Sequence, residues 1–431
     1  MQNEDREEIK RAMRVAVVGA GVTGLVAARQ LYEQHDLVVF EKNAYLGGHA
    51  NTVTVEDSGR EIALDTGFIV FNDRNYPRFN ALLAELGVES QLSEMSFGVN
   101  CDACNVGYSS RGIRGLFASP RHFFNLSVYH MAVDILRFNR WSGNLNSKNR
   151  LLNKTVGELR KSGMFGDPFF RHYLVPMTGA IWSSTGLDVD DLPLTFVLDF
   201  YRNHGLLQTS GHPRWRTVVG GSRSYVEGLV KPFRKRVRQS TPVQGIRRKK
   251  GVVELRTQEG WEFFDKVILA THTDDASRLL EDGTDSEHAV LNAIPYRKNE
   301  AILHTDESVL AKAPMARASW NCSIVDCRDP DEPLRITYDL NRLQRLQASR
   351  QYCLTLNSAG LIDPEKILLH ISYAHPVYTR DGLVARRELA AMNGKWNTFF
   401  CGAYLGNGFH EDGVVAGMET AALVQESEGD G

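Results

Sequence analysis

The sequence predicts a mixed α/β fold, α+β overall, in which a discontinuous parallel-sheet domain is interleaved with a second domain of mixed sheet and helices. Two observations predict this fold. A strand–turn–helix–strand pattern opens the chain, and apolar segments of strand length recur near the middle and near the carboxyl end. The 431 residues also exceed the usual size of one hydrophobic core.

Two short apolar segments in the opening pattern are predicted strands. Residues 15–18 and 37–40 are apolar and rich in β-branched side chains. A helix-compatible run, residues 25–33, lies between them, and Glu41 follows the second segment. This order is typical of a dinucleotide-binding unit, in which the acid accepts hydrogen bonds from ribose hydroxyls.

Three glycines, Gly19, Gly21 and Gly24, form G-x-G-x-x-G at the turn between the first strand and the helix. The first glycine permits a tight turn, the second lets backbone amides approach a pyrophosphate, and the third lets the helix pack closely on the strand. A diphosphate bound at this turn would lie at the positive end of the helix. The sequence therefore predicts a dinucleotide cofactor.

A second glycine pair, Gly47 and Gly48, follows shortly after Glu41 and indicates that the cofactor contacts continue along the chain, as they do for an extended FAD. This segment resembles the flavin-containing amine oxidase and phytoene desaturase superfamily, in which Gly-Gly-Arg follows the acid. His49 stands in place of the arginine, and a neutral imidazole is a weaker partner for an anion. The resemblance implies a Rossmann-like FAD-binding domain and an oxidoreductase.

Three later segments resemble the same superfamily: the Gly-Gly turn and helix of 218–229, the ribbon and strand of 241–271, and the closing strand, loop and helix of 399–422. In that superfamily the last helix points its amino terminus at the flavin pyrimidine ring, where it stabilises reduced flavin. The FAD-binding residues that the resemblance implies are Gly19, Gly21, Gly24, Glu41, Lys42, Gly47, Gly48, His49, Thr66, Gly67, Val243, Gly402, Ala403, His410 and Val414.

The chain as a whole is similar to a bacterial group of predicted FAD-binding oxidoreductases that are often described beside cyclopropane fatty acid synthases. LDTGFIVFNDRNYPRF, IWSS, HGLLQTSGHPRWRTVVGGS, YAHPVY and GAYLGNGFHEDG carry this similarity. It implies hydride transfer from a hydrophobic lipid, a methylated or cyclopropane fatty acyl chain, to flavin N5, with desaturation or isomerisation as the result. It also implies a cyclopropane fatty acid synthase-like methyltransferase as a partner.

Two other functions stay open. One is a flavin amine oxidase, although only Phe409 of that family's aromatic cage can be placed here. The other is a flavoprotein subunit that carries electrons or binds FAD structurally for a lipid methyltransferase. The candidate catalytic residues are Phe409 as an aromatic wall beside the flavin, His375 and Tyr373 as proton-transfer partners, and Glu411, where an acid also suits the helix dipole.

Residues 111–141 mix five arginines with six aromatic residues. Leu126, Tyr129, Val133 and Leu136 recur at helical spacing and predict an amphipathic helix that begins near Pro120. Such a segment suits an anionic membrane surface. It suits equally well a helix packed into the second domain with its arginines in water.

Cys101 and Cys104 form a C-x-x-C, but Cys322 and Cys327 are too widely spaced to make a second metal-binding pair. We therefore expect a turn with two incidental thiols and no metal. The net charge of −2 predicts no affinity for nucleic acid. Cysteine usage and the absence of a signal peptide or spanning segment predict a cytoplasmic protein, with peripheral attachment to the inner face of the membrane as the open alternative.

The predicted domains are each assembled from separated segments. The segment 366–378 is predicted to form a strand of the substrate-binding domain, and the residues after Gln425 are predicted to be disordered. The FAD-binding domain is assigned residues 13–76, 214–290 and 392–426, and the substrate-binding domain residues 77–213 and 291–391.

Overall fold

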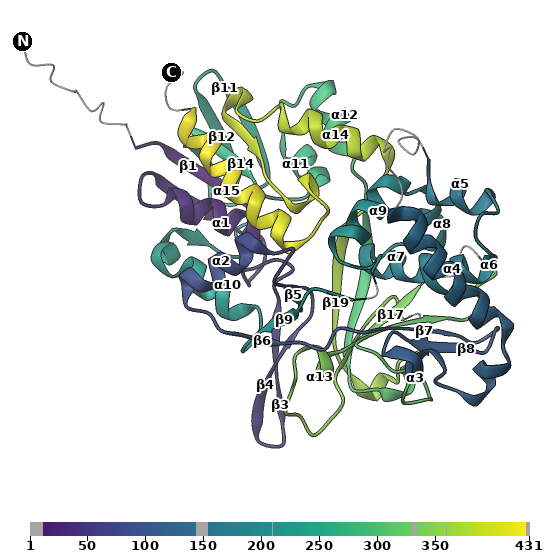
Figure 1. Ribbon diagram of the computed structural model, residues 1–431. Helices are drawn as coiled ribbons and strands as arrows, with labels where there is room; N and C mark the ends of the chain where they lie inside the picture. Colours follow the sequence, from purple (N-terminus) through teal and green to yellow (C-terminus); the bar gives the residue numbers. More distant parts are fainter. Residues whose placement is uncertain (1–11, 144–153, 209, 330–333, 359, 428–431) are drawn as a thin grey trace, which may run out of the picture. The chain divides into compact units, whose positions relative to one another are not determined.

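The computed structural model describes residues 12–143, 154–208, 210–329, 334–358 and 360–427 (Figure 1). The chain divides into two compact units. The first unit contains Met1–Ala50, Tyr225–Ala293 and Val384–Gly431, and the second contains Asn51–Ser224 and Ile294–Leu383. The boundaries differ from those expected: residues 51–76 and 214–224 belong to the second unit, and 291–293 and 384–391 to the first. The last four residues, which include most of the tail expected to be disordered, lie outside the described part.

The first unit is built on a five-stranded sheet in which every neighbouring pair is parallel. Its strands lie in the order β10 (Val237–Arg238), β2 (Asp36–Phe40), β1 (Arg14–Val18), β14 (Lys266–Leu269) and β20 (Thr398–Phe400). The two predicted opening strands are confirmed. Their apolar residues are buried, which is what a parallel sheet covered on both faces requires.

Two helices of the first unit, α1 (Val22–Leu31) and α15 (His410–Glu426), pack closely on each other. The contact depends on glycines: a Cβ added at Gly413 would lie 2.8 Å from Thr23 Oγ1, and one at Gly417 would lie 2.6 Å from the Thr23 carbonyl oxygen. The amino termini of these helices are the parts of the unit that the sequence assigned to the cofactor.

The rest of the first unit comprises a three-stranded antiparallel sheet and several helices. Two helices, α10 (Arg223–Val230) and α14 (Arg380–Ala390), each begin with residues of the second unit and end with residues of the first. The other elements are β11 (Gly245–Lys249), β12 (Val252–Thr257), β13 (Gly260–Phe264), α11 (Thr273–Leu279), α12 (Asp285–Asn292) and the short helical turns η4 (Lys231–Arg236), η7 (Lys395–Asn397) and η8 (Ala403–Leu405).

The second unit is built on a seven-stranded sheet with one parallel pair, β16 and β7; the other neighbours are antiparallel. The strand predicted at 366–378 is confirmed as β19. The strand order is β19 (Ile367–Pro376), β15 (Tyr296–His304), β18 (Cys353–Leu356), β17 (Arg335–Asp339), β16 (Trp320–Ile324), β7 (Phe97–Cys101) and β8 (Val106–Ser109).

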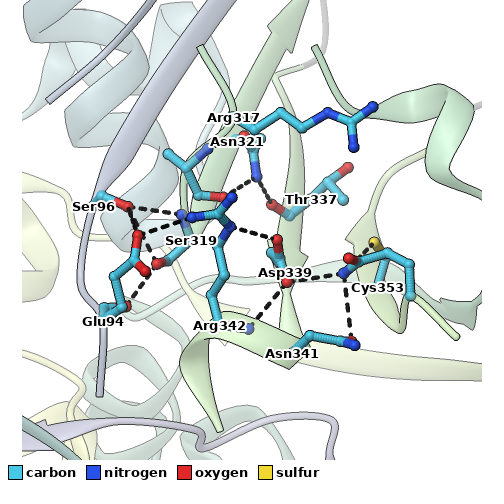
Figure 2. Close-up of polar contacts among 12 residues, drawn as sticks. Glu94, Ser96, Arg317, Ser319, Asn321, Thr337, Asp339, Asn341, Arg342 and Cys353 are labelled. Atoms are coloured by element: carbon cyan, nitrogen blue, oxygen red, sulfur yellow. Dashed lines mark hydrogen bonds and ion pairs between the residues drawn. The ribbon is translucent and has the colours of Figure 1, made fainter. Parts of the chain in front are cut away.

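Buried polar contacts fix one end of this sheet (Figure 2). Asp339, which ends β17, accepts hydrogen bonds from the backbone nitrogen and Nε of Arg342 at 3.1 and 2.9 Å. The Arg342 guanidinium also contacts Glu94, whose carbonyl oxygen accepts from the Ser319 hydroxyl at 2.6 Å. These contacts join the end of β17 to the segments that lead into β7 and β16.

The segment 111–141 forms α3 (Gly112–Leu116), a 3-10 turn η1 (Pro120–Phe124) and α4 (Leu126–Gly143). The predicted helix therefore starts six residues after Pro120. The cause is local: Asn125 is extended, and its side-chain oxygen accepts a 3.0 Å hydrogen bond from the Ser127 nitrogen, as an N-cap does. None of the helices in the described ranges has both the length and the hydropathy that crossing a bilayer requires.

The remaining elements of the second unit are two small sheets and a group of short helices. The sheets are β3 (Thr52–Asp57) with β4 (Arg60–Asp65), and β5 (Phe71–Asn72), β9 (Trp215–Val218) and β6 (Ser90–Leu92). The helices are α2 (Pro77–Leu86), α5 (Val156–Lys161), α6 (Asp167–Phe169), the π-helical turn η3 (Phe170–Leu174), α7 (Val175–Trp182), α8 (Gly186–Asp191), α9 (Leu194–Asn203), η5 (Glu307–Val309), α13 (Leu340–Leu343) and η6 (Pro364–Lys366).

Candidate functional site

The three glycines after β1 have three different surroundings. Gly19 has a φ of +105°, and a Cβ there would lie 2.5 Å from the Ala270 carbonyl oxygen. A Cβ at Gly24 would lie 2.0 Å from the Gly19 carbonyl oxygen, because α1 begins directly against the turn. At Gly21, the residue before α1, an added Cβ would meet no atom of the described chain within 4 Å. Gly21 therefore leaves open the position that a diphosphate needs at the start of a helix.

The carboxylate of Glu41 holds this glycine turn in place. One oxygen accepts from the backbone nitrogen of Ala20 at 2.8 Å, and the other accepts from the backbone and side-chain nitrogens of Asn43 at 2.8 and 2.9 Å. The oxygen that accepts from Ala20 has a further lone pair, so the predicted contact with a ribose hydroxyl is compatible with these bonds. The Thr241 nitrogen donates to the Glu41 carbonyl oxygen at 2.8 Å, which brings the loop that contains the half-buried Val243, just before β11, next to this turn.

The second glycine pair lies against the first motif. The Gly47 nitrogen donates to the Ala20 carbonyl oxygen at 2.8 Å, and a Cβ at Gly48 would lie 3.2 Å from the Gly21 Cα. Residues 27 positions apart in the chain thus form one loop surface. His49 follows, with its ring 6.3 Å from that of His272. Lys42 forms an ion pair with Asp275 on α11, at 3.3 Å.

The amino terminus of α15 is the second part of the predicted cofactor site in the first unit. Phe409 precedes the helix, and its backbone nitrogen donates to the Asp412 carboxylate at 2.8 Å. Burial raises the pKa of Asp412 to about 6. Glu411 lies between Asp412 and His410 in the first turn, whose N–H groups have no acceptor within the helix. Gly402 and Ala403 come before this turn, after β20, and Val414 is fully buried in the helix.

His410 has a buried imidazole that forms a short hydrogen bond with the hydroxyl of Tyr225 on α10. Burial lowers the pKa of His410 to about 3, so the imidazole is neutral at physiological pH. The side chain thus fixes the start of α15 from inside the unit. This is compatible with the predicted role of His410, which requires only its backbone N–H.

In the second unit, Thr66 lies beside Tyr373, and Gly67 follows Thr66. The Thr66 hydroxyl donates to the Asn51 carbonyl oxygen at 2.9 Å, so it accepts from the Tyr373 hydroxyl, 2.8 Å away. The Asn51 side-chain nitrogen donates to the Tyr373 oxygen at 3.2 Å. The phenolic hydrogen of Tyr373 is therefore already used within the protein, which favours a positioning role over proton donation to a substrate.

His375 lies two residues further along β19, and its ring stacks at 6.4 Å on that of Tyr373. Asn299, a buried residue of β15, places its side-chain nitrogen 2.9 Å from His375 Nδ1. The Asn357 side-chain nitrogen donates to the Asn299 oxygen at 2.9 Å and so fixes which end of that amide faces His375. Nδ1 is then the acceptor, and neutral His375 carries its hydrogen on Nε2.

The predicted residues therefore form three groups. One surrounds the glycine turn and another the start of α15, both in the first unit; the third is the pair Thr66 and Tyr373 with His375 in the second unit. Sequence reasoning missed Asn51, Asn299 and Tyr225. The one signal for Asn299 was an amide side chain inside an otherwise strand-like segment, where a buried polar group needs a partner.

The comparison with protein families decides the identity of the fold. The model of flavin-containing amine oxidoreductases matches residues 22–313, more than half of the chain. The chain belongs to this family. It is a flavoenzyme, an FAD-dependent oxidoreductase, and the open position at Gly21, the adjoining glycine pair and the start of α15 fit that cofactor.

Solved structures agree on the fold. Cyclohexylamine oxidase from Brevibacterium oxydans superposes with a TM-score of 0.69 at 15% identity, covering 96% of this chain and 99% of that one. A fatty acid isomerase from P. acnes, described as producing CLA, gives a TM-score of 0.62 at 15% identity, covering 96% and 98%. At these identities the likeness shows the fold and not the substrate.

A local sequence match points to desaturases. The 4,4'-diapophytoene desaturase of Staphylococcus aureus is 52% identical over 40 residues. The match covers 9% of this chain and only 8% of the desaturase.

Proposed function

We propose that this FAD-dependent oxidoreductase acts on a hydrophobic substrate, a methylated or cyclopropane fatty acyl chain, which it desaturates or isomerises. One observation carries the proposal: a surface of large apolar side chains in the segment predicted to meet a membrane. The apolar surface consists of Ile113, Phe123, Phe124, Leu126, Tyr129, Val133 and Leu136, all of them exposed.

The apolar surface is built on a helix that is already packed. The buried face of α4 carries Val128, Met131 and Phe138, whereas Tyr129, Val133 and Leu136 lie on a different face. The helix is therefore packed into the second unit on one face, and the other apolar face is exposed and available for the proposed membrane contact. Phe124 and Leu126, with 89% and 72% of their surface exposed, extend the apolar face beyond the helix start.

Aromatic contacts hold this surface in shape. Phe117 stacks on Phe123 with ring centroids 4.7 Å apart and contacts Tyr129 at 5.5 Å. The Tyr129 hydroxyl donates to the Phe123 carbonyl oxygen at 3.1 Å. The same segment carries exposed arginines, including Arg114 and Arg121. A preformed apolar surface with cations around it suits the interface of an anionic bilayer, where acyl substrates are found.

When bound, FAD would supply a hydride acceptor: an acyl chain that loses a hydride to the flavin and a proton from the adjacent carbon to a base is desaturated, and one to which the hydride is returned at another carbon is isomerised. Tyr373 is held by Thr66 and Asn51 and positions its neighbour on β19. His375, with its hydrogen on Nε2, is a donor that suits the carbonyl or carboxylate oxygen of an acyl group. The name of the fatty acid isomerase is consistent with an acyl substrate, and the name of the desaturase is consistent with desaturation.

Anaerobic incubation tests the substrate class. We expect acyl lipids with methyl-branched or cyclopropane chains to bleach the flavin if the chain is desaturated, or to yield a shifted double bond by mass spectrometry without bleaching if it is isomerised. Straight-chain saturated lipids serve as the control. Bleaching by primary amines alone would show an amine oxidase, and no reaction with either class would show a flavoprotein subunit, for which co-purification with a lipid methyltransferase is the next measurement.

Membrane contact is tested with the double variant Phe124→Glu/Leu126→Glu. We expect the unaltered protein to float with vesicles that contain phosphatidylglycerol, and the variant to lose at least about tenfold in partitioning, since burial of one large apolar side chain is worth roughly 1.5–3 kcal/mol. Leu361→Glu, at another exposed apolar position of the second unit, is the matched control and should float normally. Failure of the unaltered protein to float would remove the membrane proposal and leave the substrate test unaffected.

A further inference from the structure

Three cysteine sulfurs meet at one end of the sheet of the second unit. The Sγ atoms of Cys101, Cys104 and Cys327 all lie within 4.8 Å of one another, and those of Cys104 and Cys327 are 3.2 Å apart. Cys101 is buried, and the other two are half-buried. Cys327 lies beside the pair of Cys101 and Cys104, so the cluster has a third thiol that the sequence spacing did not indicate.

The parallel pairing of β7 with β16 brings these thiols together. Cys101 is the last residue of β7 and lies opposite Ile324, the last residue of β16. The two segments stay in register beyond the ends of the strands. The nitrogens of Asp102 and Ala103 donate to the carbonyl oxygens of Ile324 and Val325, both at 3.0 Å. The C-x-x-C turn and the loop that contains Cys327 therefore run side by side.

His172 provides a fourth potential ligand. Its Nε2 lies 4.0 Å from Cys327 Sγ. It comes from the π-helical turn η3, whose position is fixed by the Tyr108 hydroxyl, which donates to the His172 carbonyl oxygen at 2.7 Å. The His172 side chain is buried, and its Nδ1 has no hydrogen-bond partner among the described residues. A buried imidazole whose Nε2 faces the Cys327 thiol and whose Nδ1 has no partner among the described residues is not accounted for by the packing alone.

We propose that Cys101, Cys104, Cys327 and His172 bind one zinc ion. Three thiolates and an imidazole form a common closed, tetrahedral zinc site. Tetrahedral geometry with Zn–S bonds near 2.3 Å separates the sulfurs by roughly 3.8 Å, which lies between the 3.2 Å and the 4.8 Å of this cluster. Small movements of the three thiol side chains, together with a closer approach of the His172 ring, would complete the coordination.

The surroundings suit the charge of such a site. A zinc ion with three thiolates carries a net charge of −1. Arg328 lies close enough to interact electrostatically with both Cys104 and Cys327, while it also pairs with Asp326 at 2.7 Å. The proposed ion is structural: it joins the β7–β8 turn, the loop after β16 and η3, and has no part in hydride transfer.

The competing arrangement is a disulfide between Cys104 and Cys327, whose sulfurs are close. A disulfide would use two of the three thiols and leave Cys101 and His172 without a role at this position. The zinc site uses all four groups. The two arrangements differ in metal content and in the number of thiols that react with an alkylating reagent.

The test is the metal content of the purified FAD-loaded protein, grown with zinc and measured by elemental analysis. We expect about one zinc per chain, and a fall to below about 0.2 in Cys104→Ser and in Cys327→Ser. Cys353→Ala removes a buried thiol outside the cluster and should keep its zinc. The flavin absorbance of each variant shows whether it has folded.

A second measurement needs no variant. Titration of the metal-free protein with Co²⁺ should give d–d bands at wavelengths longer than those that flavin absorbs, of the intensity that tetrahedral thiolate coordination produces. A mercurial reagent should release zinc as it consumes thiols. Zinc-free protein whose Cys104 and Cys327 resist alkylation until reduced would overturn the proposal in favour of a disulfide, and zinc-free protein that develops no cobalt bands would overturn it outright.

Discussion

Replacing Gly21 by valine is expected to leave the first unit folded but unable to retain FAD, whereas replacing Gly24 by alanine is expected to destabilise that unit by about 3 kcal/mol or more. The Gly21 backbone, with φ −69° and ψ 174°, is open to any L-residue, and an added Cβ would meet no atom of the described chain. A side chain there would fill the space of the diphosphate, so we expect FAD affinity to fall by roughly 100-fold or more.

At Gly24 an added side chain would clash with the backbone of the protein. The added Cβ would lie 2.0 Å from the Gly19 carbonyl oxygen, a backbone atom that cannot rotate away. Overpacking of this kind usually costs about 1–3 kcal/mol, and a backbone clash between strand β1 and helix α1 should reach or exceed the upper value. The two glycines are three residues apart, so their variants form a matched pair.

Urea denaturation of the apoproteins measures the stability of the Gly21→Val and Gly24→Ala variants, and fluorescence titration measures their affinity for FAD. Gly21→Val should denature at nearly the urea concentration of the unaltered apoprotein and show weak FAD binding. Normal FAD binding by this variant would show that the diphosphate does not lie at Gly21. Unchanged stability of Gly24→Ala would contradict the tight contact between the turn and the helix.

The glycine turn could be predicted because its signal is local. The strands at 15–18 and 37–40, the intervening helix and Glu41 lie within one short stretch, and each glycine has a role set by its immediate neighbours. The strand β19 could be predicted equally well, since Ile367, Ile371 and Tyr373, residue types that are common in strands, lie within one stretch of seven residues. The domain boundaries could not be predicted from local patterns, because they depend on which segments pack together.

The cysteine cluster shows what sequence spacing misses. Cys104 and Cys327 are 223 residues apart and meet only because β7 pairs in parallel with β16. Spacing rules for metal sites describe ligand pairs within one turn, so they found Cys101 with Cys104 and excluded Cys327. A parallel strand pair gives no local signal for its partner, and the third thiol was therefore invisible in the sequence.

The helix α4 shows a different limit. The periodicity of Leu126, Tyr129, Val133 and Leu136 correctly indicated a helix, but it suggested one apolar face. The structure has a second apolar face around Met131 and Phe138, and this is the one that is buried. Which of two apolar faces packs is decided by the partner elements, and periodicity alone cannot choose between them.

Removing the charge of Glu287 is expected to destabilise the first unit by about 3 kcal/mol, because it leaves a buried arginine with one partner fewer. The Arg248 side chain is only 2% exposed and that of Glu287 12% exposed, and two hydrogen bonds of 2.5 and 2.8 Å join them. Asp282 retains a 3.1 Å contact with Arg248. The loss of folding stability should therefore lie at the lower end of the range for a broken buried ion pair.

Glu287→Gln is the informative single change. Glutamine can still accept from the Thr284 nitrogen, as Glu287 does at 2.9 Å, so the start of α12 keeps its cap. In Arg248→Met/Glu287→Gln the buried cation is absent as well, and we expect much of the lost stability to return. Urea denaturation of the apoproteins, arranged as a double-mutant cycle, measures the difference; equal stability of the single and double variants would contradict a coupled pair.

The same pair should govern the response of this unit to acid. The Arg248 guanidinium lowers the pKa of Glu287 from its ordinary value of 4.5 to about 2. A carboxyl group whose pKa is lower in the folded state contributes stability that is fully present above pH 4.5 and is lost as the pH falls toward 2, because the unfolded chain binds the proton first. Stability measured between these pH values should therefore fall more steeply in the unaltered protein than in the double variant. If both slopes were equal, other carboxylates would be responsible for the acid sensitivity of the FAD-binding unit.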